Sequence, residues 1–290
     1  MGNTLVRKGL RSLGVLLISW AATATHAQSI LDKVKESGVV RIGTGNDTPP
    51  MNYIDGNGEW TGFDVELGNE IAKRLGVKVE RVAVNNKTRI AFLANRQVDM
   101  VLSNVSRTVG REEQIDFADP PYLWTAKVFY ARKGRFKSLA ELGGKRIGVN
   151  QGSNAFTAAP LEIAKYSSKP AVMVSFQKNA ECFLALKQGK IDAFSQDSPI
   201  VAAVAGQEGV SFEAVGGGYS PGLYSIGVPQ DDSKWRRAVA MALQSTMKDG
   251  TYEKLYQAWF GPKGKFPLPH NARPRLPSDT FGDMMMVWPD

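Results

Sequence analysis

Short β-type runs alternate with amphipathic helical patterns through the first half of the chain. Strands are predicted at 39–44, 77–84 and 99–104, and helices at 62–76 and 89–97. This alternation is typical of an α/β protein in which helices cover a mostly parallel sheet. Polar side chains follow the third strand at once. They would therefore lie beyond the carboxyl ends of the strands, where open α/β sheets bind ligands.

The same alternation starts again in the second half, with strands predicted at 126–134, 171–176 and 191–197 and a helix at 179–189. Residues 92–104 ("FLANRQVDMVLSN") and 185–197 ("ALKQGKIDAFSQD") share one order of features. Each contains a helix end, a basic tight turn, an aspartate and a strand that ends in polar groups. This repeat predicts two similar α/β lobes whose polar strand ends line one cleft.

Residues 1–27 have the pattern of a secretory signal peptide. A basic start at 7–11 and the short apolar stretch "LGVLLISWAATA" precede the small residues Thr25 and Ala27. The apolar stretch is too short for a spanning helix with these flanks, and an N-terminal membrane anchor is the weaker alternative. We expect the signal peptide to be cleaved and the remaining protein to be soluble in the periplasm.

Charge and the scarcity of cysteine and histidine argue against several classes of function. The formal net charge is +8, but no run of Lys and Arg with interleaved aromatic residues marks a nucleic-acid surface. Cys182 is the sole cysteine and lies in a helical pattern, which indicates a buried, inert thiol and no intramolecular disulfide. His26 lies in the predicted signal peptide and His270 in a Pro-rich tail. We expect no metal site, no cofactor and no catalytic residue.

Several segments, in this order and spacing, resemble the periplasmic amino-acid-binding proteins of ABC importers, bacterial solute-binding protein family 3. The segments are "GTGNDTPPMNYIDGNGEWTGFDVELGNEIAKRLG", "DMVLSNVSRTVGREEQIDFADPPY", "LGGKRIGVNQGSN", "GKIDAFSQD" and "DGTYEKLYQAWFG". The resemblance covers nearly all of the chain after residue 27. It implies the type II periplasmic-binding-protein fold, with two α/β lobes joined by two hinge crossovers.

Arg111 lies where a helix is predicted to begin, although helix N-termini favour negative charge. Its guanidinium presents a planar fork of donors that matches a carboxylate. From the residues alone, a ligand carboxylate and a surface ion pair with Glu112, Glu113 or Asp116 explain it about equally well. The resemblance favours the ligand, because in the family the arginine of this "T-x-x-R" phrase holds the α-carboxylate of the bound amino acid.

Asp197 would complement Arg111, because a desolvated α-ammonium needs an anionic acceptor. The resemblance assigns the aspartate of the "QD" phrase to this role, and capping of the following helix is the alternative. Ser103, Asn104 and Ser106 are implied to surround the same ammonium and carboxylate. For Ser103, turn formation is an equally good explanation as ligand binding.

Ser153 and Asn154 precede a predicted helix, where backbone N–H groups bind anions. The resemblance assigns them to the ligand carboxylate from the second lobe, and a plain N-cap is the alternative. Thr48 occupies a position where many members carry an aromatic residue, and acidic-amino-acid binders have a small polar residue there. Arg89 matches a basic residue that those binders use for a second carboxylate, although another such residue is missing near Gly45. The resemblance is therefore nearest to the binders of polar or acidic amino acids.

We predict that one lobe contains residues 28–124 and 221–290 and the other contains 125–220. The crossovers would fall near "TAKVFYA" and "GLYSIGV". An amino acid would bind one lobe first, the other would close over it as a hinge, and the closed form would dock on an ABC permease with its ATPase. The protein is expected to act as a monomer.

Two rival functions fit the same pattern. Some proteins that resemble this family are periplasmic cyclohexadienyl dehydratases, which act on prephenate or arogenate. Such an enzyme needs a proton donor in the cleft, and beyond Asp197 the sequence offers no candidate. A sensory module that reports to a membrane receptor is the other rival.

Overall fold

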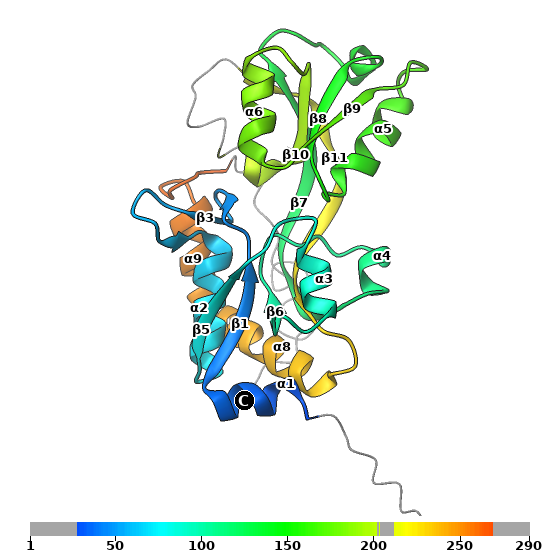
Figure 1. Cartoon of the computed structure of the whole chain (residues 1–290). Coiled ribbons are helices and arrows are strands. Elements are labelled where there is room, and N and C mark those ends of the chain that lie inside the picture. The colour runs from blue at the N-terminus through cyan, green and yellow to red at the C-terminus, as the bar shows by residue number, and fades with distance from the viewer. Residues whose placement is uncertain (1–27, 202, 204–211, 269–290) are drawn as a thin grey trace, which may run out of the picture.

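The computed structural model describes residues 28–201, 203 and 212–268, which form two lobes (Figure 1). The predicted signal peptide and both histidines lie outside the described residues. The lobe that contains the N-terminal elements is called lobe 1, and the other is called lobe 2. The elements of lobe 1 are α1 (Ile30–Ser37), β1 (Val39–Thr44), β2 (Asp47–Thr48), β3 (Asn52–Ile54), β4 (Trp60–Thr61), α2 (Phe63–Arg74), β5 (Lys78–Ala83), α3 (Arg89–Ala94), β6 (Met100–Val101), α4 (Val109–Glu112), α8 (Ser233–Lys248) and α9 (Thr251–Phe260).

Lobe 2 is built from the middle of the chain, and two long strands are shared by both lobes. The elements of lobe 2 are a 3-10 helix (Leu139–Leu142), β8 (Arg146–Asn150), α5 (Ala155–Ala164), β9 (Val172–Phe176), α6 (Asn179–Lys187) and β10 (Ala193–Asp197). The shared strands are β7 (Asp116–Arg132) and β11 (Phe212–Val228). The predicted α/β fold with two lobes is confirmed.

One mixed sheet runs through both lobes in the order β5-β1-β6-β11-β7-β10-β8-β9. Strand β1 is parallel to β5 and β6 in lobe 1, and β8 is parallel to β9 and β10 in lobe 2. The shared strands β7 and β11 are antiparallel to each other and to their outer neighbours. The sheet is therefore parallel within each lobe and antiparallel where the chain passes between the lobes.

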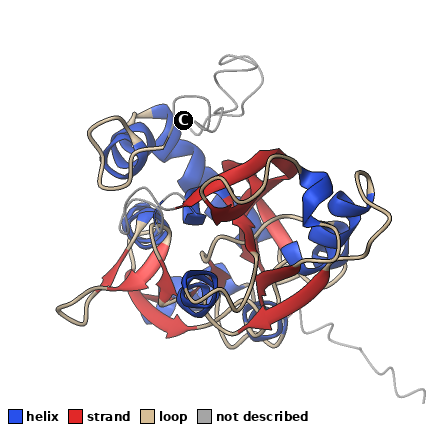
Figure 2. Ribbon diagram, turned by 90° about the horizontal axis from the view of Figure 1, so that it is seen from above, coloured by secondary structure: helices blue, strands red, loops and turns tan. Residues whose placement is uncertain are grey.

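Helices cover both faces of this sheet (Figure 2). Each face of each lobe has its own apolar core. In lobe 1 the larger core packs α1, α2, α8 and α9 on one face around the fully buried Trp235 and Trp259, and α3 covers the other face. In lobe 2, α5 and α6 cover opposite faces. No helix among the described residues combines the length and the apolarity that a membrane span needs.

The repeated phrase of the sequence places an equivalent aspartate in each lobe. Asp99 precedes β6 and accepts hydrogen bonds from the backbone and the guanidinium of Arg41 in β1. Asp192 precedes β10 and accepts the same bonds from Arg146 in β8. Each pair joins two neighbouring parallel strands, so the repeat reflects a shared local structure.

The predicted crossovers fall within β7 and β11. Thr125 pairs with Gly222, and the register between these strands shifts on the side of Tyr219. Such an irregularity interrupts the ladder of hydrogen bonds, which makes bending easier at this point. The lobe boundaries at 124 and 221 stay a prediction.

Candidate functional site

The polar loop after β6 lies buried between the lobes. Leu102 still bonds to Gly43 of β1, and then Asn104 turns the chain with a positive φ of 43°, a conformation that Asn tolerates. The hydroxyl of Ser103 accepts from the N–H of Gly45 at 3.1 Å. Ser103 and Asn104 are thus held by other loops of lobe 1, and Ser106 is buried beside them.

Asp64 anchors this loop from the first turn of α2. Its Oδ2 accepts from the backbone N–H of Asn104 and from the side chain of Asn52, both at 2.7 Å. Burial raises the pKa of Asp64 to about 6. Asp64 was not predicted from the sequence. No clear signal in the sequence marked it, because acidic residues such as Asp64 and Glu66 are usual in the first turn of a helix.

Arg89 begins α3 and is also buried. Its Nη1 donates to the carbonyl oxygens of Ser103 and Asn104, so the guanidinium supports the loop. Its Nε has no hydrogen-bond partner among the described residues. Burial, and after it the charge of Arg111, lowers the pKa of Arg89 to about 9. A direct role for Arg89 in ligand binding stays a prediction.

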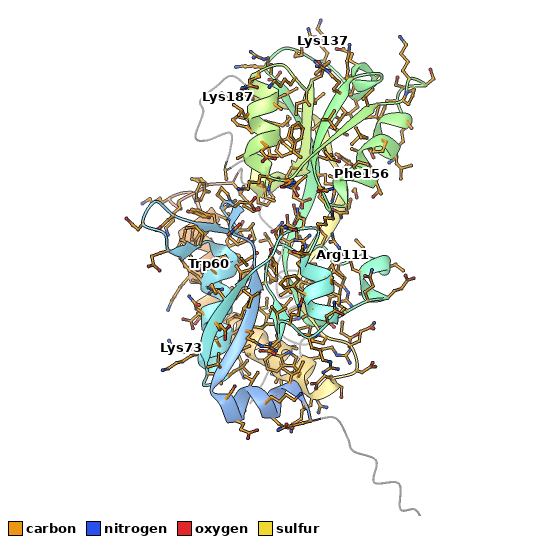
Figure 3. The ribbon with its side chains drawn as sticks, in the orientation of Figure 1. Trp60, Lys73, Arg111, Lys137, Phe156 and Lys187 are labelled. Atoms are coloured by element: carbon orange, nitrogen blue, oxygen red, sulfur yellow. The ribbon has the colours of Figure 1, made fainter. Side chains whose placement is uncertain are left out.

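Arg111 lies at the junction of the lobes (Figure 3). Its helix, α4, is a single turn, so the expected conflict with a helix N-terminus is slight. Nη1 donates to the carbonyl of Ser106 at 2.7 Å, and Nη2 donates across to the carbonyl of Gly152 in lobe 2 at 3.4 Å. Burial lowers the pKa of Arg111, and the nearby carboxylate of Asp197 opposes this effect.

The surface ion pair considered for Arg111 is not supported by its neighbours. Glu112 pairs with Arg107, and Asp116 pairs with Arg236. Arg111 instead lines a pocket of about 420 Å³ together with the start of α5. The other lining residues are Gln151, Gly152, Ser153, Asn154, Phe156, Thr157 and Ser175.

Ser153 and Asn154 therefore lie in the same pocket as Arg111. The Oγ of Ser153 is buried and has no hydrogen-bond partner among the described residues. Asn154 occupies the N-cap of α5, but its side chain makes no capping bond. Donors from both lobes thus face one space, which is suited to an anionic group.

Asp197 ends β10 and is buried next to the shared strands. Its Oδ1 lies 3.3 Å from Nζ of Lys127 in β7, and its Oδ2 accepts from the hydroxyl of Tyr224 in β11 at 2.5 Å. Tyr224 also forms a β-bridge with Ser106, whose carbonyl binds Arg111. Arg111 and Asp197 are therefore brought into one cluster through Tyr224.

Thr48 lies in β2, away from the Arg111 pocket. Its hydroxyl donates to Asp47 at 3.2 Å and accepts from Nδ2 of Asn179 in lobe 2 at 3.3 Å. Thr48 and Ser103 line a separate narrow cavity of about 10 Å³ between the lobes. The remaining residues around it are Gly45, Asp47, Asn85, Asn86, Asn150 and Gln177.

Lys127 and Tyr224 complete the cluster, and neither was predicted from the sequence. Lys127 is fully buried, and its position in β7 alternates in step with the buried residues Phe129 and Ala131. This period of two was the available signal, because residues i, i+2 and i+4 of a strand line one face. Among the described residues, no group of His, Cys, Asp and Glu is arranged to hold a metal ion.

Comparisons with known proteins show the family of this chain. Residues 40–262 match the family model of the bacterial extracellular solute-binding proteins, family 3. The lysine/arginine/ornithine-binding periplasmic protein of Escherichia coli (strain K12) is 30% identical over 258 residues, which are 86% of this chain and 95% of that protein.

Two solved structures are similar in fold. A mutant of the arginine-binding protein from T. maritima is 31% identical with a TM-score of 0.71, over 79% of this chain and 98% of that one. An ancestral amino-acid-binding protein, described as a precursor of cyclohexadienyl dehydratase, is 30% identical with a TM-score of 0.72, over 80% of this chain and 99% of that one.

Proposed function

Because the chain belongs to the bacterial extracellular solute-binding proteins of family 3, we propose that it captures a free polar or acidic L-amino acid by hinge closure and delivers it to an ABC permease. The arrangement of Arg111 and Asp197 is the main support for this proposal. The guanidinium would hold the α-carboxylate, with Ser153 and Asn154 donating from lobe 2. Asp197 would accept the α-ammonium. Closure excludes water and strengthens both contacts, because charges interact more strongly at lower dielectric.

The charges around the site favour one class of side chain on the bound amino acid. Arg89 and Lys127 are buried cations and Arg111 is a half-buried one in or beside the cluster, whereas Asp197 is its central anion. Asp64 is engaged by the backbone of Asn104 and the side chain of Asn52 within lobe 1. The relatives named for lysine, arginine and ornithine take cationic side chains. The excess of positive charge here supports a ligand with a polar or acidic side chain instead.

Export, hinge position and association are part of the same proposal. The signal peptide at 1–27 would direct the protein to the periplasm, where it would act as a monomer. The lobes would rotate about residues near 124 and 221, where the register of β7 and β11 is irregular. Loss of uptake of the labelled amino acid in cells that lack the gene would test delivery to the permease.

Calorimetry on the purified protein tests the binding function. Titration with the twenty amino acids should show binding of one ligand per chain for a small group of related ligands. Arg111→Ala should abolish binding, since the α-carboxylate loses its bidentate partner. Arg146→Ala is a matched control, because Arg146 pairs with Asp192 on the surface of lobe 2. Unchanged binding by Arg111→Ala would refute the role given to Arg111.

The dehydratase is a second candidate because a similar solved structure is described as a precursor of that enzyme. This enzyme is the less favoured candidate because Asp197 already accepts hydrogen bonds from Lys127 and Tyr224, which leaves it poorly placed to donate a proton. Incubation with prephenate, followed by the absorbance of the aromatic product, tests this activity. Turnover that Asp197→Asn removes would favour the enzyme.

A further inference from the structure

Lys127 is a fully buried lysine to which the proposed binding mode gives no task. It lies in β7 directly opposite Asp197 of β10, so both side chains lie on one face of the sheet. Its Nζ is 3.3 Å from Oδ1 of Asp197, and the other carboxylate oxygen is held by Tyr224. The aspartate expected to receive a ligand ammonium thus already has an ammonium partner within the protein.

The Lys127 ammonium has more N–H donors than acceptors around it. A lysine ammonium has three N–H donors, and Asp197 is its one hydrogen-bond acceptor among the described residues. Arg89 adds another buried donor, Nε, that lacks a partner there. Buried donors without acceptors are unfavourable. Additional acceptor oxygens brought by a ligand would therefore be favoured at this place.

The charges show which ligand supplies such oxygens. The ammonium of a neutral amino acid at Asp197 would lie beside the ammonium of Lys127, and both would share one carboxylate. Like charges at such a distance repel each other, and burial reduces screening. A carboxylate on the ligand side chain would neutralise Lys127 and remove this conflict.

We propose that Lys127 is a specificity-determining residue that donates to the side-chain carboxylate of an acidic amino acid whose α-ammonium contacts Asp197. The proposal rests on the proposed function and names its substrate class. One or two methylene groups separate the two functional groups in aspartate and glutamate, so both can reach the Lys127–Asp197 pair together. Glutamine and asparagine have the same shape and lack the charge.

The competing explanation is that Lys127 only positions Asp197. In that case its loss would weaken the binding of every amino acid to a similar extent. If Lys127 selects the ligand, its loss affects acidic and neutral ligands in opposite directions. The ligand ammonium then becomes the sole cation at Asp197, which helps a neutral ligand, whereas an acidic ligand loses its partner.

The test compares glutamate with glutamine and aspartate with asparagine by calorimetry. The wild-type protein should prefer the acidic member of a pair. Lys127→Met, which keeps the length of the side chain and removes its charge, should lower that preference at least tenfold. Lys137→Met is the matched control, since Lys137 lies at the far end of lobe 2 (Figure 3) and should keep the preference. An equal loss for both members would overturn the proposal.

A measurement on the wild-type protein covers the case in which Lys127→Met does not fold. Lysine is labelled with ¹⁵N at Nζ, and the Lys127 signal is assigned by its loss in Lys127→Arg. This signal should move at least twice as far with the acidic ligand as with its amide, because only the acidic ligand brings a carboxylate to Lys127. Equal shifts with both ligands would overturn the proposal. An unmoved signal would also overturn the proposal. If the wild-type protein binds no amino acid at all, the proposed function itself fails. Binding without preference for the acidic member leaves that function intact and refutes the role of Lys127 alone.

Discussion

Asn86 of lobe 1 donates a hydrogen bond to the side chain of Asn150 in lobe 2, with 2.8 Å between Nδ2 and Oδ1. Asn86 lies in the loop before α3, and Asn150 ends β8, so the bond crosses the cleft. Asn179 to Thr48 and Arg111 to Gly152 are further bonds between the lobes. Polar groups of the two lobes therefore meet directly across the cleft.

Gly152 is the position at which closure is most sensitive to one added methyl group. A Cβ there would lie 2.8 Å from the backbone of Asn86 and Lys87, and its φ of +77° is already unfavourable for alanine. We expect Gly152→Ala to hold the lobes apart. Small-angle scattering should show a larger radius of gyration, and calorimetry should show at least tenfold weaker binding.

Gly189→Ala separates this steric effect from the cost of the backbone conformation. Gly189 has a similar φ of +69° and nothing within 4 Å of an added Cβ. It should lower stability without opening the lobes. Equal scattering curves for Gly152→Ala and wild type would show that the contact does not limit closure.

Asp64 should make the protein less stable as the pH rises. Burial raises its pKa from 3.8 to about 6 in the folded protein, so folding favours the protonated form. Its stabilising contribution is complete below about pH 4 and is lost as the pH rises through 6, and it amounts to about 3 kcal/mol. Urea denaturation measures the free energy of unfolding of wild type and of Asp64→Asn. The value for wild type minus the value for Asp64→Asn should fall as the pH rises from 4 to 8. A difference that stays constant between pH 4 and pH 8 would contradict the raised pKa of Asp64.

Removing only one member of the buried ion pair of Lys127 and Asp197 should destabilise the folded protein. Asp197→Asn leaves a buried ammonium without a carboxylate, and we expect the free energy of unfolding to fall by about 3–5 kcal/mol. The double variant Lys127→Met/Asp197→Leu removes both charges and should regain most of that loss. Removing the exposed pair of Lys234 and Asp32 should have a much smaller effect. Additive effects in the double variant would show that the two charges do not interact.

Cys182 should be inert in the folded protein. Its side chain is fully buried in α6, and burial raises the pKa of the thiol, so little thiolate forms. Ellman's reagent should react with native protein only slowly and with one thiol per chain after unfolding in guanidinium. Leu184→Cys, at an exposed position of the same helix, gives a control thiol that reacts at once. Rapid reaction of the native wild-type thiol would contradict the burial.

The sequence determined the features that depend on local pattern. Alternating strand and helix periods predicted the α/β lobes, and the repeated phrase predicted the equivalent Asp99 and Asp192. Arg111 and Asp197 lie near polar strand ends, and the resemblance to the family assigned their roles. The tertiary structure decided which groups meet. The pairing of Lys127 with Asp197, the support of the Asn104 loop by Asp64 and the bond from Asn86 to Asn150 each join segments far apart in the chain. These contacts depend on strand register and lobe closure, which no local period of the sequence specifies.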